Sequence, residues 1–239
     1  MKKYILFDFL TVLFGICLLS ACSKDDYPEP SGDIPDFVDL GLSVKWASCN
    51  LGALKPEDCG GYYQWAGTEN VAAGEYYLNW NYCPYHTGSS SSSGFTKYNS
   101  NPSYGTVDNK TVLDPGDDVV NKELGGNWRM PTNAEWAELL DNCTLTWKAQ
   151  NGVYGYKAVS KKPGFTDKSI FLPAAGYRVF TSRIGVGEGG SYWSSSLSTG
   201  STRLASSLFF TKDGVITDDK NRCYGFPVRP VRLNKSNIY

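Results

Sequence analysis

The spacing of apolar and polar residues predicts one amphipathic helix. Apolar positions recur at helical spacing from Trp136 to Cys143, directly after Thr132 and Glu135. A threonine at the N-cap can bind the amide three residues on, and a glutamate at that position can reach back to the amide of the cap. We therefore predict a helix over roughly residues 133–142.

Short apolar or alternating runs separated by glycine, proline and asparagine predict many strands. The runs are residues 37–40, 42–47, 60–65, 144–149, 154–159, 169–178, 190–196, 203–210 and 225–232. Asn151-Gly152 lies between two of them and favours a hairpin. Residues 66–113, which include the serine run 89–93, predict an irregular loop. The pattern as a whole indicates an α+β fold that is rich in strands.

A short helical turn is predicted near residue 115, because Asp114 can cap it and Pro115 fits the first helical position. Asp117 and Asp118 follow, so the segment carries three acids. Acids near a helix start are stabilised by the helix dipole, which we favour over a calcium site as their explanation.

The first 35 residues carry the features of an export signal and a tether. Lys2 and Lys3 precede an apolar run at about residues 10–19, which is shorter than a membrane span. Leu19-Ser20-Ala21-Cys22 resembles the bacterial lipobox, so we expect residues 1–21 to be removed and Cys22 to be lipidated. The alternative is an ordinary cleaved signal. Residues 22–35 predict a flexible tether.

Charge and length place limits on the remainder of the chain. The net charge of −1 gives no basic field for nucleic acid. Residues 36–234 lack a long linker or repeat and are expected to form one domain, followed by a tail over residues 235–239.

The cysteines permit several pairings. Of seven, Cys17 leaves with the signal and Cys22 is expected to carry lipid. The remaining five are Cys49, Cys59, Cys83, Cys143 and Cys223. Five is an odd number, so at least one should be free, with two bridges at most. A Cys59–Cys83 bridge is one candidate, and five buried, unpaired thiols are the alternative.

Three segments resemble a known superfamily. Residues 128–136 read Trp-Arg-Met-Pro-Thr-Asn-Ala-Glu-Trp, which is similar to a segment of the formylglycine-generating-enzyme and C-type-lectin-like superfamily. Residues 36–47 resemble the opening strands of Fibrobacter succinogenes major paralogous domains, and residues 172–176 read Leu-Pro-Ala-Ala-Gly, a core strand in this superfamily. The resemblance implies a C-type-lectin-like fold with short twisted antiparallel sheets, one main helix and long loops.

Resemblances to known families also imply a cellular location and raise the question of an enzymatic activity. Ser23-Lys24-Asp25-Asp26 resembles the surface-export signal of Bacteroidota lipoproteins, so an outer-membrane anchor facing the cell exterior is expected; a merely acidic linker is the alternative. The enzymatic branch oxidises a sulfatase cysteine with a reactive cysteine near its C-terminus. Cys223 occupies such a position, but no second cysteine lies a few residues away. We therefore do not favour an enzyme.

Other catalytic or metal chemistry finds little support. The single histidine, His86, is expected to be a solvated loop residue and excludes the HExxH zinc motif. The glycines of residues 185–190 lead into a strand, so they predict a turn and no dinucleotide site. The acid pairs 117–118 and 218–219 are adjacent and cannot flank a sugar as glycosidase acids do. No catalytic residue, metal or cofactor is predicted.

A non-catalytic ligand site is the remaining prediction. In lectin-like folds, ligands bind to the C-terminal loops. In this chain the corresponding segments are residues 195–203 and 217–224, which are rich in hydrogen-bonding groups. The loop near residue 82 adds aromatic rings that could stack on a ligand. The candidate residues are Trp80, Tyr82, Tyr85, Tyr192, Trp193, Arg203, Asp218, Asp219, Asn221, Arg222 and Tyr224. Core positions are the alternative for the aromatic residues. The expected function is adhesion or capture of a glycan or protein ligand, with an accessory subunit of a surface assembly or a formylglycine-generating-type oxidase as alternatives.

Overall fold

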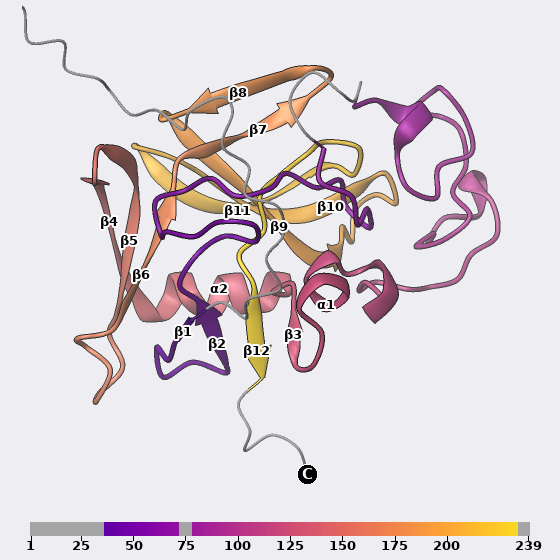
Figure 1. Cartoon of the computed structure of the whole chain (residues 1–239). Helices are drawn as coiled ribbons and strands as arrows, with labels where there is room; N and C mark the ends of the chain where they lie inside the picture. Colours follow the sequence, from indigo (N-terminus) through magenta and orange to yellow (C-terminus); the bar gives the residue numbers. More distant parts are fainter. Residues whose placement is uncertain (1–35, 72–77, 234–239) are drawn as a thin grey trace, which may run out of the picture.

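The computed structural model describes residues 36–71 and 78–233 (Figure 1). The expected signal, Cys22, the tether and the tail lie outside the described residues. Three mostly antiparallel sheets surround the longer α-helix of the described chain, so the predicted α+β, strand-rich class is confirmed.

The largest sheet has five strands in the order β11-β10-β9-β7-β8. Their bounds are β7 Ala175–Val179, β8 Ser182–Val186, β9 Gly189–Leu197, β10 Leu204–Thr211 and β11 Gly214–Asn221. The four-stranded sheet has the order β1-β2-β12-β3, formed by β1 Phe37–Val38, β2 Val44–Ala47, β12 Val231–Leu233 and β3 Trp128–Arg129. The third sheet joins β4 Cys143–Gln150, β5 Val153–Ser160 and β6 Ser169–Pro173.

The predicted helix is confirmed as α2, Asn133–Asn142. Thr132 Oγ1 accepts a hydrogen bond from the amide of Glu135 at 3.2 Å, and Glu135 Oε2 accepts one from the amide of Thr132 at 2.8 Å. This reciprocal pair is the expected capping box. Trp136 and Leu139 are fully buried, so the apolar face of the helix enters the core.

The expected hairpin is also confirmed. β4 pairs with β5 in full register, and Asn151 and Gly152 both adopt positive φ in the turn. Two consecutive residues with positive φ are what a tight type I′ turn requires, and Asn-Gly meets that requirement at low cost.

The predicted strand 169–178 is in fact two strands in different sheets. Ala174 separates β6 from β7, and Gly176 has a φ of +61°. A Cβ on Gly176 would lie 2.1 Å from the carbonyl oxygen of Ile184, so only glycine allows this approach. The small residues therefore turn the chain from one sheet into the next.

Several other predicted strands differ from those in the structure. Residues 60–65 and 225–228 contribute only isolated bridges, such as Tyr63 with Phe226, and do not form the expected strands. Strands β8 and β11 were not predicted, and β11 falls in a segment expected to be a loop. The glycine turn expected at residues 185–190 is confirmed between β8 and β9.

Residues from the two ends of the described chain close the core. β12 pairs with both β2 and β3, so segments far apart in the sequence form one sheet. The buried Arg229 strengthens this closure, because its guanidinium donates to Asn50 Oδ1 at 2.9 Å, the Ser48 carbonyl at 2.8 Å and the Phe171 carbonyl at 2.8 Å. Buried charged groups require such hydrogen bonds.

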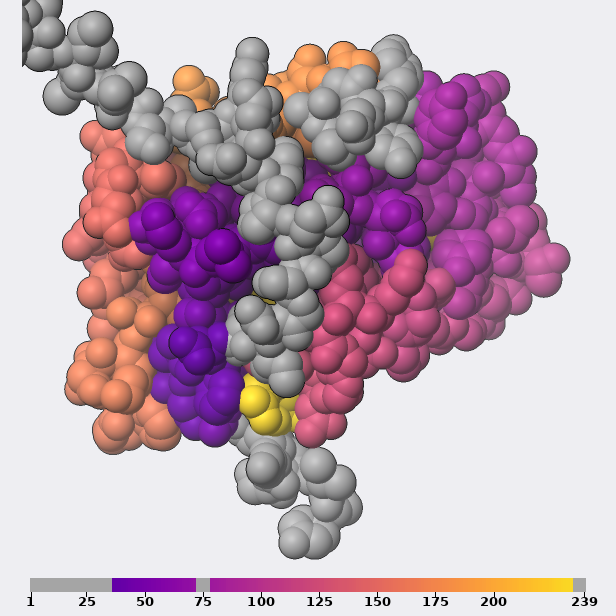
Figure 2. Space-filling view, viewed as in Figure 1, coloured from indigo at the N-terminus to yellow at the C-terminus, as the bar shows by residue number. Residues whose placement is uncertain are grey.

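Residues 78–113 form a lobe at one side of the molecule (Figure 2). Regular structure in it is limited to the 3-10 turns η1 Trp80–Tyr82 and η2 Pro102–Tyr104, in agreement with the predicted irregular loop. The lobe is held by Asp117, whose carboxylate accepts hydrogen bonds from Tyr85 at 2.6 Å and Tyr98 at 2.5 Å and pairs with Lys97 at 2.5 Å.

The acids near residue 115 have structural partners. The expected short turn is η3, Pro115–Asp117, and α1, Val119–Leu124, follows it. Asp114 is the N-cap residue of η3, as expected, but makes no side-chain capping hydrogen bond. Asp118 caps α1, and its Oδ1 accepts a hydrogen bond from the amide of Val120 at 2.9 Å. Asp114 pairs with Lys97 and Lys110. The helix-start explanation therefore fits Asp118, whereas Asp114 and Asp117 pair with lysines. Among the described residues, no group of three His, Cys, Asp or Glu side chains is placed to hold a metal ion.

Candidate functional site

The hairpin of β10 and β11 carries most of the candidate site. β11 is an edge strand of the five-stranded sheet and pairs with β10. In this pairing Asp219 of β11 lies opposite Ser206 of β10. Residues 217–221 were expected in a loop, yet they belong to a strand. Strand geometry fixes these side chains more firmly than a loop would.

A polar pocket of about 540 Å³ opens beside this hairpin. Asp219 accepts hydrogen bonds from Ser198 Oγ at 2.5 Å and Ser206 Oγ at 2.8 Å. Asp218 pairs with Lys220 at 2.5 Å. Burial opposes ionisation of Asp218, but the hydrogen bond from Lys220 lowers its pKa overall. Asp218 is therefore a carboxylate at neutral pH.

One residue that lines the polar pocket has an unused acceptor. Asn133, the first residue of α2, lines the pocket, and its buried Oδ1 has no hydrogen-bond partner among the described residues. An acceptor of this kind is stabilised when a donor reaches it. The pocket is also lined by Thr111, Val112, Ser196, Leu197, Thr199, Ser206 and Thr217. Hydroxyl groups can both donate and accept, so the pocket suits a polar ligand.

A second, more aromatic pocket of about 410 Å³ shares Asp219 as a wall. Tyr177 and Tyr224 stack with their ring centroids 6.2 Å apart, and Lys220 lies over the Phe209 ring at 5.2 Å. The other lining residues are Ser191, Leu204, Asn221 and Phe226. Apolar walls with a few polar groups are typical of ligand sites.

The structure brings together four of the predicted ligand residues: Asp218, Asp219, Asn221 and Tyr224. Sequence reasoning missed Asn133, Tyr177, Phe209 and Lys220. Lys220 was within the quoted segment but was not chosen. The other three lie in regular elements away from that segment, and only the tertiary fold brings them to the pockets.

Three predicted ligand residues are instead core residues. Tyr192, Trp193 and Arg222 are completely buried. The Tyr192 hydroxyl donates to the Pro173 carbonyl at 2.7 Å, and Trp193 Nε1 donates to the Tyr63 carbonyl at 2.8 Å. These residues cannot contact a ligand at the surface in this conformation, so the core alternative applies to the two aromatic residues.

Arg222 is enclosed by aromatic rings. Its guanidinium carbon lies 4.7 Å from the Trp65 ring centroid and 4.3 Å from that of Phe95. Nη1 donates to the carbonyls of Tyr98 at 3.2 Å and Thr202 at 3.1 Å. Burial lowers the pKa of Arg222 to about 10. Through these ring contacts and hydrogen bonds, Arg222 connects the lobe to the segment that follows β11.

The remaining predicted residues line neither pocket, and three of them, Trp80, Tyr82 and Tyr85, belong to the lobe. Tyr82 is 60% exposed, whereas Trp80 packs on His86 and Tyr85 is engaged with Asp117. Arg203 lies over the Tyr104 ring at 5.8 Å. Of this group, Tyr82 is the residue most open to a partner.

His86 is not the solvated residue that the sequence suggested. Its ring is 4.9 Å from the centroids of both Trp80 and Phe95, and Nδ1 lies 2.7 Å from the Gly88 carbonyl oxygen. Packing between two aromatic rings gives it a structural role in the lobe.

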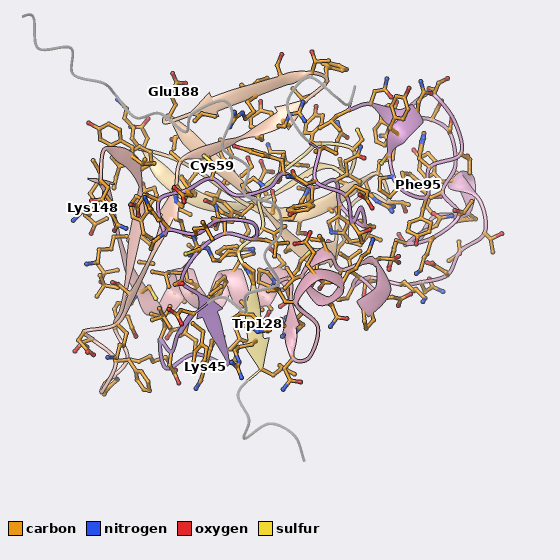
Figure 3. All side chains as sticks on the ribbon, in the orientation of Figure 1. Lys45, Cys59, Phe95, Trp128, Lys148 and Glu188 are labelled. Atoms are coloured by element: carbon orange, nitrogen blue, oxygen red, sulfur yellow. The ribbon has the colours of Figure 1, made fainter. Side chains whose placement is uncertain are left out.

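The candidate Cys59–Cys83 bridge is not formed. Cys83 is a free, buried thiol that packs with Phe95 and Cys223, while Figure 3 shows Cys59 near the centre of the molecule and Phe95 in the lobe. The expectation of at least one free cysteine is confirmed, since Cys49, Cys83, Cys143 and Cys223 are free.

Comparisons with known proteins add no family to this description. No family model matches the chain, and neither a curated protein nor a solved structure matches it. Among the described residues, the helices are too short or too polar to cross a bilayer.

Proposed function

We propose that the chain is a non-catalytic binding domain that captures a glycan or a protein segment at the β10–β11 hairpin. The observation that carries this proposal is the shared wall at Asp219, which joins a hydroxyl-rich pocket to an aromatic one. A ligand that spans both would meet hydrogen-bonding groups on one side and ring faces on the other. Sugars and short peptides both present such mixed surfaces.

The C-type-lectin-like class is part of the same proposal. It is supported by the resemblance of residues 128–136, which contain the capping box of α2, and by the short sheets and long lobe. In that class the C-terminal part of the domain meets ligands. The pockets lie on β9 to β11 and on nearby residues, in agreement with this placement.

The carboxylates favour binding over catalysis. Asp219 is held by two serine hydroxyls and Asp218 by Lys220, and the two are adjacent on one strand. General acid and base catalysis of sugar hydrolysis requires two carboxyl groups that face the bond from opposite sides. Fixed carboxylates of this kind serve better as hydrogen-bond acceptors for hydroxyl or amide groups.

We also propose that a lipid on Cys22 anchors the domain to the outer membrane, facing the exterior. The support is the Leu-Ser-Ala-Cys sequence and the polar tether that follows it. Protease treatment of intact cells should release the domain. Protection of the domain in intact cells, with cleavage only after lysis, would contradict surface display.

Glycan and peptide arrays probed with the purified chain test the binding function. We expect selective binding to a small set of related glycans or peptides. An accessory subunit would instead give no array signal and would co-purify stoichiometrically with another envelope protein, and that result would overturn the proposal. Oxidation of a sulfatase-type cysteine peptide, lost in Cys223→Ala, would favour the oxidase alternative.

A further inference from the structure

Two cysteines that are distant in sequence meet in the interior of the lobe. Cys83 follows η1, and Cys223 follows β11. They pack together against Phe95, and their thiol groups interact through a hydrogen bond. Both are almost fully buried, with 5% and 3% of their surface exposed.

The backbone around each thiol is fixed by contacts of its own. The amide of Cys83 donates to the Trp80 carbonyl at 3.4 Å, and the Cys223 carbonyl accepts from Gln64 Nε2 at 3.0 Å. Arg222, directly before Cys223, stacks on Phe95 at 4.3 Å. The fold therefore brings the two side chains together independently of any bond between them.

We propose that Cys83 and Cys223 form a disulfide in the exported protein. An oxidising compartment favours bridges between neighbouring thiols. The reaction is exchange with a disulfide of an oxidoreductase or of a small thiol oxidant. The thiolate of one cysteine attacks this disulfide to form a mixed disulfide and release one thiol. The second cysteine then displaces the other thiol, so the Cys83–Cys223 bond forms as the oxidant accepts two electrons and two protons.

Cys223 is the better candidate for the attacking thiol. The hydrogen bond from Cys83 lowers the pKa of Cys223, whereas burial and the hydrogen bond to Cys223 raise the pKa of Cys83. The thiolate is the reactive form in exchange. Because both thiols are buried in the folded domain, the oxidant reaches them when the lobe opens locally while the two side chains are still in contact.

The bridge would attach the lobe covalently to the chain that leaves the candidate site. Tyr224 follows Cys223 directly and stacks on Tyr177 in the aromatic pocket. A fixed Cys223 would restrict the position of Tyr224. The bridge does not depend on a ligand, so it can be tested without one.

Differential alkylation of the full-length chain from oxidising envelope fractions tests the bridge. The chain is denatured in the presence of one alkylating reagent, which labels the free thiols. It is then reduced and treated with a second reagent of different mass, which labels the thiols released from disulfides. Mass spectrometry identifies the labelled peptides. We expect the second label on Cys83 and Cys223 and the first on Cys49 and Cys143. The first label on Cys83 and Cys223, or a bridge from either to another cysteine, would overturn the proposal.

Thermal unfolding of reduced and oxidised chain gives a second measurement. Refolding in a glutathione redox buffer should raise Tm by about 5 °C or more over the reduced chain, because the bridge closes a long loop. Cys83→Ser should abolish this rise, and Cys143→Ser, which alters another buried free cysteine, should retain it. An equal rise in Cys83→Ser would contradict the assignment. If Cys83→Ser does not fold, the alkylation of the unaltered chain still decides.

Discussion

Burial separates side chains of the same chemical type into ligand-facing and structural sets. Trp193 lies on the central strand β9 and is fully buried, whereas Tyr224, just beyond β11, is half-buried and lines a pocket. Both are aromatic residues in the C-terminal third of the chain, so residue type could not distinguish them. The position of each residue in the sheet determines whether its ring is buried, and the order of the strands in the sheet cannot be read from the local sequence.

Glu135 illustrates a residue whose role could be predicted from local sequence. Its carboxylate caps α2 and also forms a two-point pair with Arg129, at 2.8 Å to Nη1 and 2.5 Å to Nη2. Burial opposes ionisation, but Arg129 and the Thr132 amide lower the pKa of Glu135 below its ordinary value of 4.5. This contribution to stability is therefore present above pH 4.5 and is lost as the pH falls through the lower folded-state pKa.

Glu135→Gln should lower the free energy of unfolding by about 2–3 kcal/mol at neutral pH, because the half-buried Arg129 loses its counter-charge. Urea denaturation at a series of pH values measures this. The difference from the unaltered chain should shrink as the pH falls from about 5 to 3. Glu188→Gln, at an exposed glutamate, is the control and should change little. A loss that is independent of pH would contradict the charge-based account.

At the scale of elements, local signals were sufficient where an element is stabilised by its own sequence. The capping box defines the start of α2, and Asn151-Gly152 defines the β4–β5 turn. β11 was missed because its strand conformation depends on pairing with β10, and its polar residues 217–221 are typical of loops. Ala174 and Gly176 were assigned to a single strand over residues 169–178. The change of sheet at this point depends on the close approach of Gly176 to the backbone of Ile184, which the local sequence does not reveal.

The lobe depends on one carboxylate as a shared anchor. Asp117→Asn would remove the charge that faces Lys97 and weaken the hydrogen bonds from Tyr85 and Tyr98. We expect a loss of about 2–3 kcal/mol in the free energy of unfolding and faster proteolysis within residues 78–113. Limited proteolysis followed by mass spectrometry locates the cleavage sites. Asp213→Asn, in the exposed β10–β11 turn, should leave the lobe as resistant as before, and equal resistance in Asp117→Asn would refute this role.

At the scale of the whole molecule, the candidate site arises from segments that only the complete fold assembles. Asn133 comes from the start of α2, Tyr177 from β7 and Asp219 from β11. The sequence led to Asp218, Asp219, Asn221 and Tyr224 because they are clustered polar and aromatic residues near the C-terminus. It could not supply the opposite walls, since these depend on the packing of β7, β9 and β10.

The dissociation constant of an array-selected ligand for Asp219→Asn tests the proposed site most directly. Asp219 borders both pockets, and the loss of a charged hydrogen-bond acceptor should weaken binding about 10-fold or more. Isothermal titration would compare this variant with the unaltered chain and with Asp213→Asn, and circular dichroism would verify that each is folded. The account predicts weaker binding in Asp219→Asn alone. Unchanged affinity in a folded Asp219→Asn variant would contradict it.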